Sequence, residues 1–166
     1  FVNKRKREKR MAYISTDDVK HIRNTLKKEF PQYKFSVRRD SIYSVTVSFM
    51  KGPSFKDWEY RDRYTGEMKV GSLNDGEHHQ INHFYTTDFY GIENAKILDK
   101  VYRIMKVAPA LNGGKAWYDN SDAMTDYFDT AYYMHIEVGK WDKPYEIVDH
   151  QLDSLVDACK NSLEAA

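Results

Sequence analysis

Two consecutive runs of alternating apolar and polar residues constrain the fold of this 166-residue chain more than any other feature. They cover residues 33–37 and 43–49, within "YKFSVRRDSIYSVTVSF". Because successive side chains of a strand point to opposite faces, this alternation is typical of two half-buried strands. Gly52 and Pro53 then end the second strand. We therefore expect a hairpin with one face on the core and its Ser/Thr face toward water or a partner.

The residues before this hairpin predict a helix. Ser15 and Asp18 have the spacing of a capping box, and Ile14 and Val19 have that of a hydrophobic staple. Apolar residues then recur three and four positions apart, at Val19, Ile22, Leu26 and Phe30, until Pro31 ends the pattern. The opposite face carries Lys20, Arg23, Lys27 and Lys28. These basic residues either form an ordinary solvated face or contact phosphates.

Helical spacing returns after Gly91, at Ile97, Leu98, Val101, Met105 and Ala108, with Pro109 expected just beyond the helix end. A third strand is predicted with Tyr132, Met134, Ile136 and Val138 on one face and Tyr133, His135 and Glu137 on the other. Beyond Pro144 we expect a last helix with one apolar stripe, formed by Val148, Leu152, Leu155, Val156, Cys159 and Leu163. This order predicts an α+β fold, with a small antiparallel sheet of three or more strands packed against two or three helices on one face.

We expect one domain over residues 11–166, preceded by a basic arm at 1–10 and interrupted by an aromatic-rich insertion at about 54–90. Thr65-Gly66 within the insertion predicts the turn of a short protruding hairpin. Aromatic and basic residues alternate around that turn, at Trp58, Tyr60, Arg61, Arg63 and Tyr64. They either contact a partner, by stacking on bases or entering a protein groove, or simply cover the core.

The net charge of +1 conceals a strong asymmetry along the chain. Residues 1–39 contain 13 Lys/Arg against 4 Asp/Glu, a balance of +9, whereas residues 116–166 contain 3 against 11, a balance of −8. The candidate polyanion-binding residues are Lys4, Arg5, Lys6 and Arg7 of the arm, the four basic helix residues, and Arg38 and Arg39 at the corner between the two strands. The alternatives are a linker for the arm and a soluble turn for the corner.

We found no convincing catalytic or metal-binding constellation. His79 and His83 are four residues apart, as in some zinc sites, but neither they nor His78 have a cysteine or carboxylate that completes a set. Four aspartates, Asp119, Asp122, Asp126 and Asp129, lack the glycine and glutamate of a calcium loop. Cys159 is the only cysteine, and its place on the apolar stripe predicts a buried small side chain. We expect no enzyme, cofactor, metal or membrane partner.

Two stretches, Ile22 to Pro53 and Asp122 to Val138, resemble a known family, the large polyvalent protein-associated domain of type 29. The resemblance includes a helix ending in "FP", the "KFSV" strand, a V-x-V strand before "GP", and "DAMTD", where Ala123 replaces the glycine we expect. The insertion is longer than the family pattern, and the basic arm lies outside it. The resemblance implies an origin in a mobile genetic element such as a phage or plasmid, and it implies no reaction. Because the single cysteine can form no internal disulfide, we expect the protein in the cytoplasm of the bacterial host.

Two functions from different classes fit these observations. One is a binding module that contacts nucleic acid through the arm, the helix face and the corner. The other is an anti-defence inhibitor or adaptor that docks on a host or mobile-element protein, with its acidic C-terminal part imitating nucleic acid. The oligomeric state is left open by the sequence.

Overall fold

The first helix forms where the capping signals predict it. In the computed structural model, which describes residues 12–148 and 159–164, α1 spans Thr16–Glu29. Ser15 Oγ accepts a hydrogen bond from the Asp18 N–H at 3.0 Å, and the Asp18 carboxylate accepts one from the Ser15 N–H at 3.2 Å. Val19, Ile22 and Leu26 are buried along one side of the helix. Both the capping box and the apolar stripe are confirmed.

The predicted hairpin follows α1. Strand β1 spans Lys34–Ser41 and pairs antiparallel with β2, which spans Ser44–Gly52. The turn between them consists of Ile42 and Tyr43. The sequence placed the corner between the strands at Arg38 and Arg39. This position is wrong, because both arginines lie within β1.

The sheet is mixed, with strand order β1-β2-β6-β5. Strand β5 spans His79–Gln80 and β6 spans Tyr133–Val138, while β7, at Glu146–Ile147, pairs with the end of β2. Strands β6 and β7 run parallel to β2, so the prediction of an antiparallel sheet is wrong for these two pairs. The long connection through a helix explains the direction of β6, since a chain that crosses over a sheet through a helix returns parallel to its starting strand, and β7 then continues along the same edge of β2.

That connection contains α2, which spans Thr86–Leu111. A short helical segment precedes Gly91, where φ is 79° and the helical conformation is interrupted, and the main helix follows Gly91 as predicted. An added Cβ at Gly91 would lie 2.8 Å from Cβ of Trp58, so this position needs glycine for both its backbone angle and its close contact. Pro109 lies inside the last turns of α2, not beyond its end as predicted.

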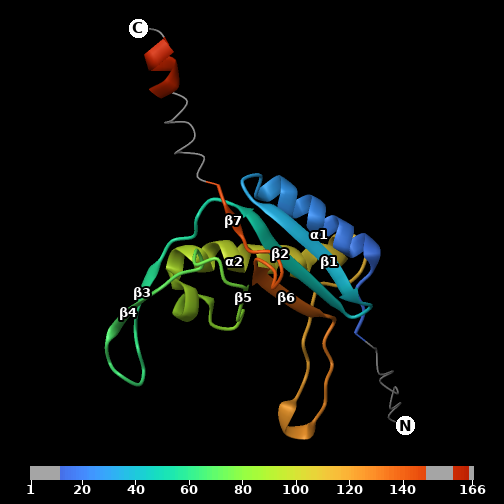
Figure 1. Ribbon diagram of the computed structural model, residues 1–166. Coiled ribbons are helices and arrows are strands. Elements are labelled where there is room, and N and C mark those ends of the chain that lie inside the picture. Colours follow the sequence, from blue (N-terminus) through green and yellow to red (C-terminus); the bar gives the residue numbers. More distant parts are fainter. Residues whose placement is uncertain (1–11, 149–158, 165–166) are drawn as a thin grey trace, which may run out of the picture.

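Both helices lie against the apolar face of the sheet, and the α+β class is confirmed (Figure 1). The core combines Val45, Val47 and Phe49 of β2 with Ile22 of α1 and Leu98 of α2, among others. The opposite face of β2 carries Ser44, Thr46 and Ser48, which are buried although the sequence predicted that they would face water or a partner. They are covered by polar side chains of the neighbouring strands, described below.

The predicted last helix is present at residues 159–164, but the chain directly after Pro144 is not helical. Tyr145 is buried and donates a hydrogen bond from its hydroxyl to the Pro53 carbonyl oxygen at 2.7 Å, and β7 then joins the edge of β2. A strand forms here because the edge of β2 beyond β6 offers unpaired backbone groups. Of the predicted stripe, Leu152, Leu155 and Val156 lie outside the described residues. Cys159 is exposed, which corrects the prediction that it is buried.

Two segments project from the domain (Figure 1). One is the predicted hairpin of the insertion, with β3 at Trp58–Arg61 and β4 at Met68–Gly71. The other is a long loop between α2 and β6 whose two sides are joined by bridges at Asp119–Thr130 and Asp122–Tyr127. A short 3-10 turn, η1, at Ala123–Thr125 forms its tip. Among the helices that the structure describes, none has the length and apolar content needed to cross a membrane.

Candidate nucleic-acid interface

One flank of α1 carries exposed basic side chains. We call Lys20, Arg23, Lys27 and Lys28 the basic flank; steps of three and four residues place Lys20, Arg23 and Lys27 on neighbouring turns of the helix, and Lys28 directly follows Lys27. On the other flank Glu29 forms an ion pair with Lys100 of α2, with 3.2 Å between Nζ of Lys100 and Oε2 of Glu29. The Glu29 side of α1 therefore contacts α2.

Arg23 also fixes α1 to the edge of the sheet. Its Nη2 donates to the carbonyl oxygen of Val37 in β1 at 2.9 Å. A guanidinium has five N–H donors, so this bond leaves most of them free for another acceptor. Arg23 is thus held in place while remaining exposed.

Arg38 and Arg39 point to opposite faces of β1, as neighbouring residues of a strand must. Arg39 lies on the helix side, where its guanidinium carbon is 5.7 Å from the ring centroid of Tyr13, just before α1. Its Nε is buried without a hydrogen-bond partner among the described residues. Arg39 therefore adjoins the start of the helix that bears the basic flank, and Arg38 does not.

Arg38 instead belongs to a polar cluster on the opposite face of the sheet. Its Nε is 2.8 Å from Oδ1 of Asp40 and its Nη2 is 3.2 Å from Oε1 of Glu137. Glu137 is only 7% exposed, and it also accepts hydrogen bonds from the Ser48 hydroxyl and, at 2.7 Å, from His78 Nε2. The charge of Arg38 is thus balanced by two carboxylates.

The pKa of Glu137 reflects these contacts. Burial alone would raise it, but the hydrogen bonds from Ser48 and His78 and the charge of Arg38 outweigh burial, so the pKa lies below its ordinary value. Sequence reasoning missed this cluster, although it placed Glu137 on the same face as Tyr133 and His135. The missing signal is the parallel register, which sets Ser48 opposite Glu137.

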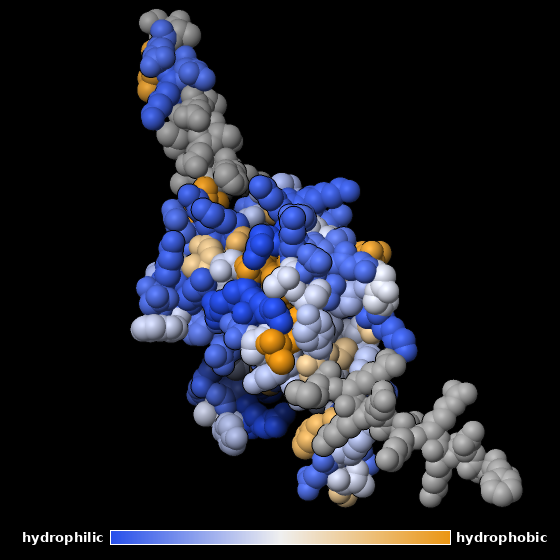
Figure 2. Space-filling view, turned by 90° about the vertical axis from the view of Figure 1, so that its right-hand side faces the viewer, coloured by the Kyte–Doolittle hydropathy of each residue, from blue (hydrophilic) through white to orange (hydrophobic). Residues whose placement is uncertain are grey.

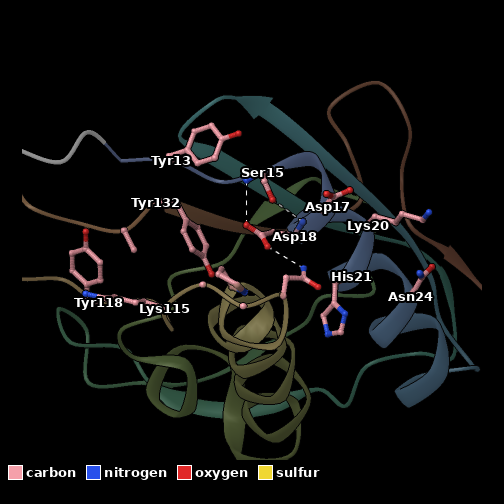
Figure 3. A pocket seen from close by; sticks show the side chains of 15 residues that line it. Tyr13, Ser15, Asp17, Asp18, Lys20, His21, Asn24, Lys115, Tyr118 and Tyr132 are labelled. Carbon is pink, nitrogen blue, oxygen red and sulfur yellow. Dashed lines mark hydrogen bonds between the residues drawn. The ribbon is translucent and has the colours of Figure 1, made fainter.

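A pocket of about 800 Å³ opens beside the start of α1 (Figure 3). Its sides come from the first turns of α1, the end of α2 and the segment leading to Tyr118. Asn112 Nδ2 donates to Asp18 Oδ1 at 3.0 Å, which joins the end of α2 to the beginning of α1. The charged and aromatic side chains that line it include Tyr13, Asp17, Lys20, His21, Lys115 and Tyr118.

The arm residues Lys4, Arg5, Lys6 and Arg7 lie outside the described residues. Tyr13, at the start of the described residues, lines this pocket. Lys20 is the member of the basic flank that also lines the pocket. The structure therefore places Lys20, Arg23, Lys27, Lys28 and Arg39 around α1 and separates Arg38 from them.

The aromatic and basic residues of the insertion have two different environments. Trp58 is half-buried and packs on Gly71 and Gly91, where an added Cβ at Gly71 would lie 2.3 Å from its ring. Tyr60, Arg61, Arg63 and Tyr64 are exposed along the hairpin. Trp58 thus anchors the hairpin to the domain, and the partner-binding prediction rests on the four residues beyond it.

The histidines and aspartates considered as metal ligands have other contacts. His78 bonds Glu137, His79 bonds Asp75 at 2.7 Å, and the His83 ring lies 4.8 Å from that of Tyr102. Burial, followed by the nearby Lys106 and His135, lowers the pKa of His83. The four aspartates lie on the projecting loop, where Asp122 caps η1 by accepting from the Met124 N–H. Within residues 12–148 and 159–164, no three side chains of the metal-binding types gather into one site.

Comparison with known proteins gives one match. A family model described as "Large polyvalent protein associated domain 29" matches residues 14–105, more than half of the chain. The matched range includes α1, β1 and β2, and it ends before the Asp122 to Val138 stretch that contributed to the resemblance. No curated protein and no solved structure matches the chain.

Proposed function

Since the chain belongs to the large polyvalent protein associated domain 29 family, we propose that it is a non-enzymatic binding module of a phage or plasmid polyvalent protein, and that it contacts nucleic acid. The contact surface is the basic flank of α1 with Arg39, extended by the basic arm. Arg38 is left out, because Asp40 and Glu137 already balance its charge.

The observation that carries this proposal is the separation of opposite charges in the fold. Among the ion pairs of the described residues, the Arg38–Glu137 pair alone joins the basic segment 1–39 to the acidic segment 116–166. Among the described residues, the basic flank and Arg39 form no ion pair with an acidic side chain. Their charge is thus available to an external polyanion, whose bound counterions they would release.

The surrounding surface supports a polar partner. In Figure 2, which shows the molecule from the right-hand side of Figure 1, the domain is largely hydrophilic and its apolar areas are small and separate. Large exposed apolar patches mark many protein-docking surfaces. A face of this kind suits the phosphate backbone of a nucleic acid better.

A salt titration of binding tests the proposal. Affinity for a short DNA or RNA is measured by fluorescence anisotropy from about 50 to 200 mM salt. The wild-type protein should show log affinity falling linearly with log salt. The triple variant Lys20→Gln, Lys27→Gln, Lys28→Gln should bind at least about tenfold more weakly at low salt, and each lost phosphate contact should reduce the slope by about 1.

The matched control removes three positive charges elsewhere, in the variant Lys56→Gln, Lys140→Gln, Lys143→Gln. These side chains belong to segments outside α1 and should leave the slope close to that of the wild type. Equal loss in both triple variants would mean that net charge alone matters, and the proposed surface would be wrong. Absence of any binding by the wild-type protein at low salt would reject nucleic acid as the partner.

The projecting hairpin favours a second candidate, an inhibitor or adaptor that docks on a host protein. Tyr64 is 96% exposed at its tip, and Met68 and Val70 on β4 are also exposed. Exposed aromatic and aliphatic side chains on a projecting element are suited to fill pockets of a partner. The aspartate-rich loop adds an acidic surface that would imitate nucleic acid. This candidate gains support if the salt titration detects no nucleic-acid binding.

A further inference from the structure

The pocket beside α1 combines aromatic and basic side chains on its two sides. In Figure 3, Tyr13, Tyr118 and Lys115 lie on one side, and Lys20, His21 and Asn24 of α1 lie on the other. Tyr13 is 59% exposed and Tyr118 is half-buried, so both rings are accessible. Its volume of about 800 Å³ is ample for one nucleotide.

The polar groups at the floor of the pocket already have partners. Asp18 accepts from Ser15 and Asn112 through its two carboxylate oxygens, and the Tyr132 hydroxyl donates to the Met105 carbonyl oxygen. By contrast, the hydroxyl groups of Tyr13 and Tyr118 and the ammonium groups of Lys20 and Lys115 form no hydrogen bond or ion pair within the described residues. The groups available to a ligand therefore include these hydroxyl and ammonium groups and the side chains of His21 and Asn24, while the Tyr13 ring also has the Arg39 guanidinium carbon 5.7 Å from its centroid.

From this arrangement we infer that the pocket receives an unpaired base of a single-stranded nucleic acid. The inference rests on the proposed function and specifies its substrate class. Tyr13 and Tyr118 stack on the base, Lys20 and Lys115 bind the adjoining phosphates, and His21 and Asn24 hydrogen-bond the base edge. A paired base in a duplex is stacked between its neighbours and cannot enter such a pocket.

The pocket adjoins the basic flank, because Lys20 belongs to both. A strand whose base enters the pocket would therefore lie beside the first turns of α1. Asp17, which also lines the pocket, opposes phosphate, and Asp17→Asn should strengthen binding a fewfold.

The test compares single strands with a duplex. Anisotropy is measured with a labelled 12-nucleotide single-stranded DNA, the same sequence as RNA, and the corresponding DNA duplex, all at low salt. We expect the wild-type protein to bind a single strand at least about fivefold more tightly than the duplex. The variant Tyr13→Ala, Tyr118→Ala should lose about tenfold in single-strand affinity, because stacking contributes strongly for each base. Its duplex affinity should be unchanged.

Two control variants separate stacking from structural effects. Tyr13→Phe, Tyr118→Phe keeps both rings, and it should retain single-strand affinity. Tyr64→Ala, Tyr85→Ala removes two exposed tyrosines elsewhere and should also bind as the wild type does. A second measurement uses the wild-type protein, so that its result does not depend on whether the alanine variant folds. Photocrosslinking of a 5-iodouracil single strand should yield adducts at Tyr13 or Tyr118.

The outcomes distinguish this inference from the proposed function. Nucleic-acid binding with equal affinity for single strand and duplex, or adducts that map away from both tyrosines, would overturn the pocket assignment and leave the basic flank intact. Loss of single-strand binding in the variant Tyr64→Ala, Tyr85→Ala would also overturn the pocket assignment. Failure of the wild-type protein to bind any of the three nucleic acids would overturn both.

Discussion

Glu137 is the residue on which the polar face of the sheet depends. Its carboxylate accepts from Ser48, His78 and Arg38 while 7% exposed. Three donors that lose a common acceptor in a buried site destabilise the folded state, because their lost hydration is no longer compensated.

We predict that Glu137→Gln lowers the free energy of unfolding by about 1–3 kcal/mol, measured by urea denaturation at pH 7. The amide replaces one acceptor oxygen with a donor that faces other donors. Glu146→Gln is the matched control, since the Lys51–Glu146 pair, at 3.6 Å, is exposed on both sides and should change stability by less than about 1 kcal/mol. A similar loss in both variants would contradict the prediction.

The same residue gives a pH dependence of known sign. The folded-state pKa of Glu137 lies below the ordinary value of 4.5, so its stabilisation is complete above pH 4.5 and is lost as the pH falls through the lower, folded-state pKa. Acid unfolding of Glu137→Gln should therefore show a shallower dependence on pH in this range than that of the wild type. Parallel curves for the two proteins would show that Glu137 does not titrate in this way.

The alternation of residues along the predicted strand indicated which face of the strand Glu137 occupies, but it did not indicate that Glu137 is buried. Alternation is local and shows that Glu137, His135 and Tyr133 share a side. Burial arises from Arg38 and Ser48 on β1 and β2, and sequence spacing contains no information on that pairing. The basic flank was predictable because helical spacing is local, whereas the pocket joins Tyr13 to Tyr118 across about a hundred residues.

At the scale of elements, the end of α2 shows how a proline is accommodated inside a helix. Pro109 has no N–H, so it cannot donate to the carbonyl oxygen of Met105 four residues earlier. The buried hydroxyl of Tyr132 donates to that oxygen instead. One side chain next to β6 thus completes the hydrogen bonding of α2, and the helix continues to Leu111.

Because the Tyr132 hydroxyl replaces the missing N–H of Pro109, we predict that the effects of mutations at these two residues on stability depend on each other. Tyr132→Phe should reduce the free energy of unfolding by about 1–3 kcal/mol, because the Met105 carbonyl oxygen is then buried without a donor. In the Pro109→Ala background the introduced alanine supplies a backbone N–H that bonds this oxygen, so the same change should cost clearly less. A double-mutant cycle from urea denaturation measures the difference. Purely additive effects would show that Tyr132 and Pro109 act independently.

Elements marked by nearby residues were predicted well, and elements that depend on distant strands were not. The Ser15–Asp18 capping box and the Gly52-Pro53 stop are local signals, and both are confirmed. The parallel direction of β6 depends on the path of α2 between it and β2. Beyond Pro144 the sequence suggested a helix; Glu146 and Ile147 pair with the free edge of β2 as β7, whereas residues 159–164, which include two members of the predicted stripe, are helical.

At the scale of the whole molecule, the hairpin of β3 and β4 is a nearly independent projection. Trp58 anchors it on Gly71 and Gly91, and the residues of the hairpin beyond Trp58 are mostly exposed. We predict that replacing residues 60–69 with a short glycine-rich turn leaves unfolding cooperative and changes the melting temperature by only a few degrees. Circular dichroism on heating measures this.

The truncation also separates the two candidate functions. Nucleic-acid affinity should be unchanged, since the basic flank and the pocket are built from other segments. Trp58→Ala is the contrasting variant, and it should destabilise the domain by about 3 kcal/mol through loss of a packed ring. If truncation destabilises the protein as much as Trp58→Ala does, the hairpin is an integral part of the core.

The central position of β2 determines where the domain can be cut. Its backbone is bordered by β1 along one edge and by β6 and β7 along the other. The family match stops at residue 105, before either of these later neighbours has been reached. A recombinant fragment that ended there would leave the middle strand of the sheet open to pairing with other chains. Expression trials should therefore extend at least to Ile147, and a newly synthesised chain cannot complete its sheet until that residue has left the ribosome.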